Sequence, residues 1–273
     1  MDKKSIQTVT VMIFTGLLFL QSLFAGGVAS RETGLVLSAM RSLRRADNLH
    51  YTVEIYHTQN DETMSQTQEI WANLLTGTWA AEYSSADADG SMTVLEEFCD
   101  GNQVLSCNAG IWSPWSGYSD DTDIPNFTTF SDINYEEEDI AEAESIETDD
   151  GMKIVFSLAD EHLERERDAL LDESAWEEEG ADDGLELYYE QYENTRFENI
   201  TLIYTVDTDG VLIGMEYSYE ASRPQILIGS GGQEELGEQE RYLSGAKVTL
   251  LEYNSTGIDE KLSEVAADAG YDK

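Results

Sequence analysis

Apolar and polar residues alternate along most of the chain, and helical spacing is confined to shorter segments. In the first alternating run, Tyr51, Val53 and Ile55 face one way and the residues between them face the other. Similar runs are found at 67–75, 78–84, 91–99, 103–112, 152–159, 197–206, 211–219 and 247–253. Because short turns join most consecutive runs, the pattern predicts a meander of antiparallel hairpins rather than alternating strands and helices.

Apolar residues recur at helical spacing within 32–46 and 258–267, near the two ends of the chain. An acidic stretch at about 116–196 separates the two groups of hairpins. For this stretch we predict a short exposed helix within 135–150 and further helices at 160–179 and 185–194. We therefore expect one α+β domain, 31–273, that contains this stretch as an insertion.

The first thirty residues predict export. Lys3 and Lys4 precede an uncharged, mostly apolar run, and small residues occupy 25–30, which is the pattern of a secretory signal peptide. A retained signal anchor is the alternative, because the run is long enough to span a bilayer. We favour cleavage, since polar and glycine residues weaken the second half of the run. Either way the domain is secreted or lies on the extracytoplasmic face, and only residues 1–30 contact the membrane.

The charge of the chain is strongly negative. It has 56 acidic and 15 basic residues, a formal net charge of -41, and no Lys or Arg between Arg45 and Lys153. Such a surface repels nucleic acid and anionic membranes and attracts cations or basic proteins. A solvated surface that keeps an exported protein soluble explains the same composition.

Cys99 and Cys107 are the two cysteines, and export makes a disulfide chemically possible. The turn at 100–102 pairs Cys99 with a residue near 103 or 104, so Cys107 lies about four residues further along the next strand. That separation exceeds the ~7 Å limit between the Cα atoms of bridged cysteines. We expect two free thiols.

Candidate metal and catalytic residues are few. Ser85, Asp87, Asp89, Gly90 and Glu96 have the spacing of calcium-loop ligands, which makes Asp87, Asp89 and Glu96 candidate calcium ligands. The flanking runs alternate like strands, however, and an acidic turn between two strands explains the same residues.

The histidines and carboxylates define no catalytic site. His50 and His57 lie at opposite ends of one predicted strand, and His162 is predicted on a solvated helix face. The many carboxylates single out no catalytic pair, and no nucleotide or nucleophile motif is present. We expect a protein that is not an enzyme and holds no cofactor.

Aromatic and large apolar residues gather on the predicted hairpins. They line either a packed core or a ligand cavity. The candidate cavity residues are Trp71, Trp79, Phe98, Trp112, Met215 and Tyr217.

Two local units suggest a family. The segment Phe98-Cys-Asp-Gly-Asn-Gln-Val leads on to Ile111-Trp112, and a later hairpin reads Tyr204-Thr-Val-Asp-Thr-Asp-Gly-Val-Leu-Ile-Gly-Met-Glu. With the helix that precedes them, these units resemble the LolA-like family of exported lipoprotein carriers. The resemblance implies an unclosed, curved, antiparallel barrel-like sheet that holds helices and shelters acyl chains in a hydrophobic cavity. It assigns no functional residue here, and it does not cover the acidic stretch.

The leading hypothesis is a non-enzymatic protein of the cell envelope that binds a lipid, another hydrophobic small molecule or a peptide in this half-barrel. The second is an interaction or sensor module whose acidic surface docks a basic protein. The third is an acidic calcium-binding protein, and a hydrolase is the least favoured.

Overall fold

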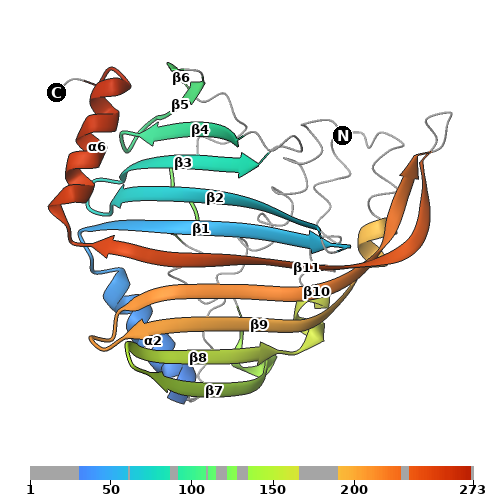
Figure 1. Cartoon of the computed structure of the whole chain (residues 1–273). Coiled ribbons are helices and arrows are strands. Elements are labelled where there is room, and N and C mark those ends of the chain that lie inside the picture. Colours follow the sequence, from blue (N-terminus) through green and yellow to red (C-terminus); the bar gives the residue numbers. More distant parts are fainter. Residues whose placement is uncertain are drawn as a thin grey trace.

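Eleven strands form one antiparallel sheet in the order β6-β5-β4-β3-β2-β1-β11-β10-β9-β8-β7 (Figure 1). The structure, a computed structural model, describes residues 31–60, 62–86, 92–108, 110–114, 122–127, 135–165, 190–228 and 234–271. The predicted signal segment lies outside these residues. Within them, the two edge strands β6 and β7 do not pair, so the sheet is unclosed. The expected α+β fold with an unclosed antiparallel sheet is confirmed.

The elements follow the chain in two groups. The first strands are β1 (Asn48–Gln59), β2 (Glu62–Asn73), β3 (Thr78–Ala86), β4 (Met92–Cys99), β5 (Val104–Asn108) and β6 (Ile111–Pro114). The later strands are β7 (Ile140–Thr148), β8 (Gly151–Leu158), β9 (Arg196–Asp207), β10 (Leu212–Ile228) and β11 (Glu234–Tyr253). The helices are α2 (Arg31–Leu43), the 3-10 helix η1 (Glu137–Asp139) and α6 (Thr256–Asp268), with helical turns at 160–165 and 190–193.

The sheet consists of two meanders joined by its first and last strands. β1 to β6 pair in sequence order on one side, and β7 to β11 do so on the other. β1 pairs with β11 from Leu49↔Tyr253 to Gln59↔Tyr242, with one register shift. This pairing is the contact between the two halves of the sheet.

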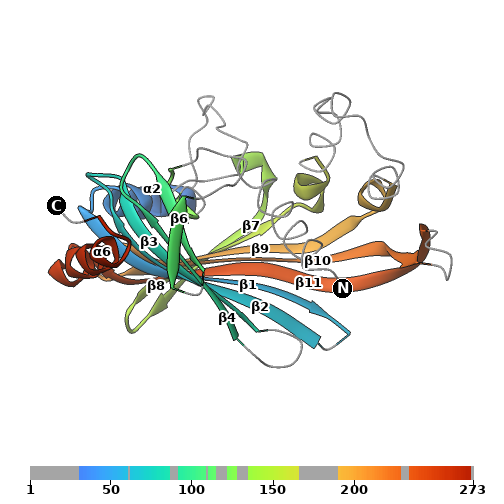
Figure 2. The same ribbon diagram turned by 90° about the horizontal axis from the view of Figure 1, so that it is seen from above.

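Helices α2 and α6 cover opposite faces, here called the α2 face and the α6 face (Figures 1 and 2). Helix α2 contacts β7, β9 and β10, and α6 contacts β1, β2 and β3. Val36, Met40 and Leu43 of α2 belong to the large core cluster, whereas Ile258 and Leu262 of α6 belong to a small separate one. The two clusters follow from strand geometry, because successive side chains point to opposite faces.

The predicted turns are confirmed in their chemistry. At the turn after β4, the Asp100 Oδ1 atom accepts hydrogen bonds from the amides of Asn102 and Gln103, and Gly101 has a φ of 93°. After β9, Asp207 Oδ1 accepts from the amides of Asp209 and Val211. In both turns an aspartate side chain satisfies backbone amides that the tight bend leaves without a ladder partner.

Two predicted elements were wrong. The predicted helix within 135–150 contains η1 and strand β7, which pairs with β8. Its glutamates sit on an exposed edge strand, where charge is tolerated because one edge faces solvent. The predicted strand 103–112 is divided into β5 and β6 by a turn at Gly110, whose φ is 78°. The glycine-rich loop that the sequence predicts at 229–232 lies outside the described residues, and β10 and β11 extend up to either side of it.

The predicted insertion contributes to the sheet as well. β7 and β8 lie within 116–196, and β8 pairs with β9. Much of the predicted helices at 160–179 and 185–194 lies outside the described residues, with helical turns described at 160–165 and 190–193.

Both cysteines are buried and free, as predicted. Cys99 belongs to the large core on the α2 face, and its sulfur lies 3.9 Å from the Thr122 carbonyl oxygen. Cys107 of β5 lies opposite Glu96 of β4, so these two side chains share a face of the sheet. Glu96 is an odd number of residues from Cys99 along β4, so Glu96 and Cys99 point to opposite faces. The sheet therefore separates the two thiols.

The side chain of Asn48 connects the β1–β11 junction to α6. Asn48 is buried; its Nδ2 donates to the Ser255 carbonyl oxygen at 3.0 Å, and its Oδ1 accepts from the Ser255 amide at 2.9 Å. The Ser255 side chain in turn accepts a hydrogen bond from Gly257 at the N-terminus of α6. Asn48 thus fixes the position at which the chain leaves the sheet and enters the helix.

We predict that Asn48→Ala lowers the free energy of unfolding by about 2 kcal/mol, because it leaves two buried backbone groups of Ser255 without their partner. Urea denaturation monitored by tryptophan fluorescence measures this loss. Asn108→Ala, at an exposed position of β5, is the matched control and should change stability by less than about 0.5 kcal/mol. Equal stabilities of the two variants would contradict the role given to Asn48.

Candidate ligand-binding site

The α2 face carries a continuous apolar and aromatic layer that spans both meanders. Strand alternation places these side chains on one face, and all are at most 8% exposed. From the sheet, the layer includes Leu49, Tyr51, Val53, Ile70, Ala72, Trp79, Ala81, Ile154, Phe156, Ile200, Leu202, Tyr204, Met215, Tyr217, Tyr219, Tyr242 and Val248. We call this set the interior layer.

A short segment without a strand ladder, residues 122–127, covers part of the interior layer. Side chains of the sheet hold it through three hydrogen bonds. Trp79 Nε1 donates to the Thr122 carbonyl oxygen at 2.9 Å, and the Tyr51 hydroxyl donates to the Pro125 carbonyl oxygen at 2.5 Å. Asn126 Nδ2 donates to Gln68 Oε1 at 2.6 Å. We call residues 122–127 the cover segment.

The cover segment also contributes apolar side chains. Ile124 and Phe127 pack against the core cluster that contains the interior layer. At the margin of the segment, a pocket of about 260 Å³ is lined by Thr122, Asp123, Ile124 and Phe127 together with Gly77 and Gly101. The cover segment therefore separates the interior layer from an opening at the turn end of the sheet.

Polar groups are buried within this apolar layer. The hydroxyls of Tyr135 and Tyr204 interact with each other, but neither reaches the geometry of a well-formed hydrogen bond. Burial raises the pKa of both. Burial also raises the pKa of Glu97, and a hydrogen bond from Tyr83 opposes that shift. Because buried polar atoms are normally paired, the two tyrosine hydroxyls are positions where a polar group can be received.

The structure divides the six predicted cavity residues between two faces. Trp79, Met215 and Tyr217 belong to the interior layer. Trp71 and Phe98 lie on the α6 face in the small cluster, and Trp112 packs against that cluster. Sequence reasoning took all six as one lining, whereas strand alternation separates them.

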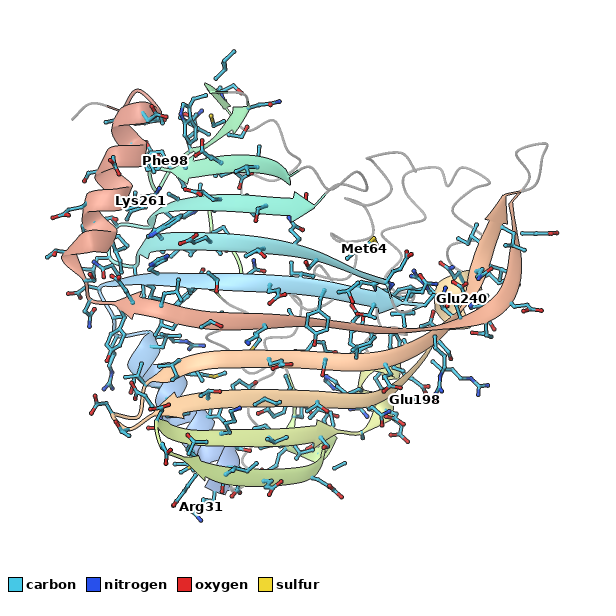
Figure 3. All side chains as sticks on the ribbon, in the orientation of Figure 1. Arg31, Met64, Phe98, Glu198, Glu240 and Lys261 are labelled. Carbon is cyan, nitrogen blue, oxygen red and sulfur yellow. The ribbon has the colours of Figure 1, made fainter. Side chains whose placement is uncertain are left out.

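The three residues on the α6 face pack beneath α6. Lys261 Nζ lies 4.7 Å from the centre of the Trp71 ring and 3.1 Å from Glu82 Oε1, and Trp112 Nε1 donates to Asp268. Phe98 and Lys261 are labelled beside this helix in Figure 3. The binding of a ligand by the other three residues, Trp79, Met215 and Tyr217, stays a prediction.

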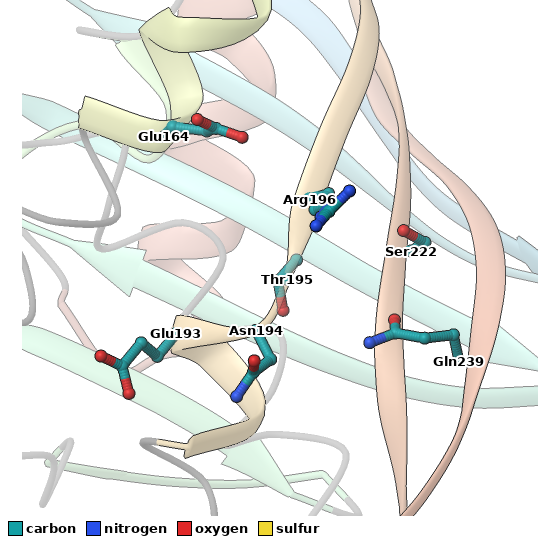
Figure 4. A pocket seen from close by; sticks show the side chains of 7 residues that line it. All are labelled: Glu164, Glu193, Asn194, Thr195, Arg196, Ser222 and Gln239. Atoms are coloured by element: carbon teal, nitrogen blue, oxygen red, sulfur yellow. The ribbon is translucent and has the colours of Figure 1, made fainter.

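A second pocket, of about 390 Å³, lies near the start of β9 and has a polar lining (Figure 4). It is lined by Glu164, Glu193, Asn194, Thr195, Arg196, Ser222 and Gln239. None of the six predicted residues lines it. Sequence reasoning missed it because its residues come from two helical turns and three strands, with no shared motif.

The predicted calcium ligands are only partly within the described residues. Asp87 and Asp89 lie outside them, and Glu96 lies on β4 opposite Glu82 of β3. The flanking segments are strands, as the sequence indicated, rather than the helices of an EF-hand. In the described part of the chain, no group of three His, Cys, Asp or Glu side chains is arranged to hold a metal ion. Calcium binding by Asp87, Asp89 and Glu96 stays untested.

The histidines occupy structural positions. His50 stacks on Trp71 with ring centres 4.8 Å apart and lies 2.8 Å from Glu69 Oε1. His57, an odd number of residues further along β1, belongs to the other face and packs on Tyr242.

The prediction that His162 lies on a solvated helix face was wrong. His162 is buried, and its Nδ1 lies 3.0 Å from Oδ2 of the buried Asp139, whose other oxygen pairs with Arg165. The cluster ties the helical turn at 160–165 to η1, because Asp139 also accepts a hydrogen bond from the Glu136 amide. Burial lowers the pKa of His162. The surrounding charges hid this role, since sequence spacing does not show that Asp139 folds back onto the turn.

No protein-family model and no curated protein matches the chain in sequence. Among solved structures, the fold is similar to the lipoprotein LppX of Mycobacterium tuberculosis, with 10% identity, a TM-score of 0.40, and 81% of this chain and 94% of that chain covered. It is similar to LprF from Mycobacterium bovis, with 10% identity, a TM-score of 0.37, and coverage of 84% and 96%. A further similar structure is MucB in complex with MucA(peri), with 9% identity, a TM-score of 0.19, and coverage of 86% and 97%.

The resemblance in fold to these solved structures is weak and partial. With TM-scores below 0.5, the likeness is confined to the general course of the chain. Among the residues that the structure describes, no helix is both long and apolar enough to cross a membrane.

The burial of Glu97 makes the stability of the folded protein depend on pH. The folded protein holds the Glu97 proton more tightly than the unfolded chain, whose glutamates titrate near about 4.3. Above that pH the unfolded chain ionises first and is favoured, so stability falls until the pH passes the folded-state pKa. Glu97→Gln removes this loss. The stability of the variant relative to the wild type should therefore rise between pH 4 and pH 7, as measured by urea denaturation.

The matched control is Glu54→Gln, at an exposed position of β1. Its stability relative to the wild type should stay level over the same pH range. A rise of the same size in both variants would show that the effect belongs to the overall charge and not to the burial of Glu97.

Proposed function

We propose that the protein is a non-enzymatic, exported envelope protein that binds an acyl chain or a similarly apolar ligand on the α2 face. The observation that carries the proposal is the cover segment 122–127, which lies on an aromatic layer and is held to the sheet by three side-chain hydrogen bonds. The ligand enters at the pocket beside Gly77 and Gly101 and takes the place of Ile124 and Phe127.

The energetics allow this exchange. Three hydrogen bonds contribute about 3 kcal/mol net to holding the segment. Exposing Ile124 and Phe127 costs roughly 5 kcal/mol more. An acyl chain of about sixteen carbons contributes roughly 13 kcal/mol when it is buried, at about 0.8 kcal/mol per methylene. A long chain therefore offsets the displacement of the segment, whereas a short one does not.

The buried hydroxyls favour a ligand that also carries one hydrogen-bonding group. Tyr204 is fully buried and Tyr135 nearly so, and neither hydroxyl makes a well-formed hydrogen bond. A carboxyl, ester or hydroxyl group among the apolar side chains would satisfy them. The acidic surface and the buried Glu97 disfavour a strongly anionic ligand.

The test uses the fluorescent fatty acid 16-(9-anthroyloxy)palmitic acid, whose chain has the length that the energetics require. Tyr51→Phe keeps the aromatic wall but removes the hydroxyl that holds Pro125, and it should raise the affinity about fivefold, since a net hydrogen bond contributes about 1 kcal/mol to the competing cover segment. Fluorescence titration of the wild type and the variant measures the change.

Tyr271→Phe is the matched control, because Tyr271 packs on Phe98 on the α6 face, away from the interior layer and the cover segment. Its affinity should equal that of the wild type. The proposal is overturned if neither the wild type nor Tyr51→Phe binds the probe saturably. It is also overturned if Tyr51→Phe binds more weakly, because the cover segment would then support the ligand rather than compete with it.

A further inference from the structure

β10 and β11 extend beyond the rest of the sheet as a two-stranded ribbon (Figure 1). β9 pairs with β10 as far as Ser222↔Arg196, and β1 pairs with β11 as far as Gln59↔Tyr242. The pairing between β10 and β11 continues to Ile228↔Glu234, with one register shift between Pro224 and Ile226. We call this projecting part, residues 223–228 and 234–241, the arm. Neither outer edge of the arm is paired with a strand in the part of the chain that the structure describes.

The two edges of the arm differ in how well a further strand can pair with them. On the β10 side, Pro224 has no N–H, and its carbonyl oxygen accepts a hydrogen bond from Gln191 Nε2 at 2.6 Å. On the β11 side, the Gln59 side chain contacts Glu240 at the base of the arm. Beyond Glu240, the described residues place no strand beside β11. Unpaired edges of this kind are templates for an added strand, and an isolated two-stranded ribbon is only marginally stable.

The charge of the arm limits what can dock there. Residues 224–240 contain four glutamates and no Lys or Arg. The arginines at the base are engaged, with Arg223 stacked 4.9 Å above the Tyr242 ring and Arg241 Nη2 2.9 Å from Glu198 Oε2. Figure 3 labels Glu198 and Glu240 at this base. In a chain of net charge -41, a second copy or an anionic membrane is repelled, and a cationic partner is attracted.

A few apolar side chains accompany these charges. Ile226 pairs with Leu236 across the ribbon, and Leu227, which is 42% exposed, pairs with Glu235. A strand added beside β11 would meet four glutamates and one apolar neighbour, Leu236. Opposite charges and apolar groups across adjacent strands each stabilise the pairing.

We propose that the outer edge of β11 in the arm, Glu234–Glu240, binds an extended basic segment of another protein as an added β-strand. Main-chain hydrogen bonds supply the affinity, and Glu235 and Glu238 select Lys or Arg side chains. This docking site is separate from the interior layer, so peptide binding at the arm can be tested independently of ligand binding in the interior layer.

The probe is a fluorescein-labelled ten-residue peptide of alternating lysine and valine, followed by fluorescence anisotropy at 50 mM salt. A second peptide, in which proline replaces every valine, has the same charge but cannot form a ladder. The wild type should bind the valine peptide and bind the proline peptide at least about tenfold more weakly. Equal affinities would overturn strand addition.

Paired charge reversals locate the site. E235K/E238K should weaken the valine peptide about tenfold, since attraction to its lysines becomes repulsion at both positions. E142K/E144K makes the same change in net charge on the exposed edge strand β7 and should weaken it less than about twofold. The proposal is overturned if both variants lose the same affinity, or if the β7 variant loses more. It is also overturned if the wild type binds neutral lipid vesicles through the arm but not the peptide.

Discussion

The pairing of β1 with β11 is the interaction on which the rest of the structure depends. Every other pairing in the sheet joins strands that are neighbours in sequence, with β8 and β9 separated by the longest connection. β1 and β11 instead lie at opposite ends of the domain, so their pairing closes a loop of about 190 residues and bears the largest entropic cost. Without it there would be two small meanders, neither of which has a full interior layer.

Gly245 makes this pairing possible. A Cβ atom at this position would lie 2.4 Å from the Tyr217 carbonyl oxygen and 2.5 Å from the Tyr56 hydroxyl. Glycine therefore allows Tyr56 of β1 to lie across β11 and reach towards β10, where Ser218 interacts with its hydroxyl. The same junction positions α6, because Asn48 at the start of β1 holds Ser255 just after β11.

Much of the fold follows from local sequence pattern, and the long-range parts do not. Alternation predicted most strands, and Asp-Gly turns predicted the hairpins at Asp100 and Asp207. The pairing of β1 with β11 has no local signal. β7 was missed because alternating glutamates read equally well as a solvated helix, and only its pairing with β8 distinguishes the two.

The candidate site also has parts that the local sequence pattern could predict and parts that it could not. The alternation of side chains along the strands could have separated Trp71 from Trp79, because the Thr76-Gly77 turn fixes which residues of β2 and β3 lie opposite each other. Trp71 lies opposite Ala80, so Trp79, the residue before Ala80, points to the other face. The cover segment and the buried Tyr135 hydroxyl could not have been predicted, because they come from stretches with no periodicity. The glycines at 229–232 predicted a flexible loop, but no local signal predicted the long strands on either side of it, in which Ile226 and Leu236 lie opposite each other across the ribbon.

Strands β10 and β11 belong to both proposed sites, which has a thermodynamic consequence. Met215 and Tyr217 of β10 line the interior layer, and the same strand continues through Tyr219 to Arg223 at the base of the arm. The aromatic rings of Tyr217, Tyr219 and Tyr242 form a packed series along this path, ending at the Arg223 guanidinium. If a ligand in the interior layer shifts this series, it changes the affinity of the arm for a basic strand, and the strand must change the affinity for the ligand by the same factor. Equal affinities of the arm with and without ligand would instead mean that the sheet isolates the two sites from each other.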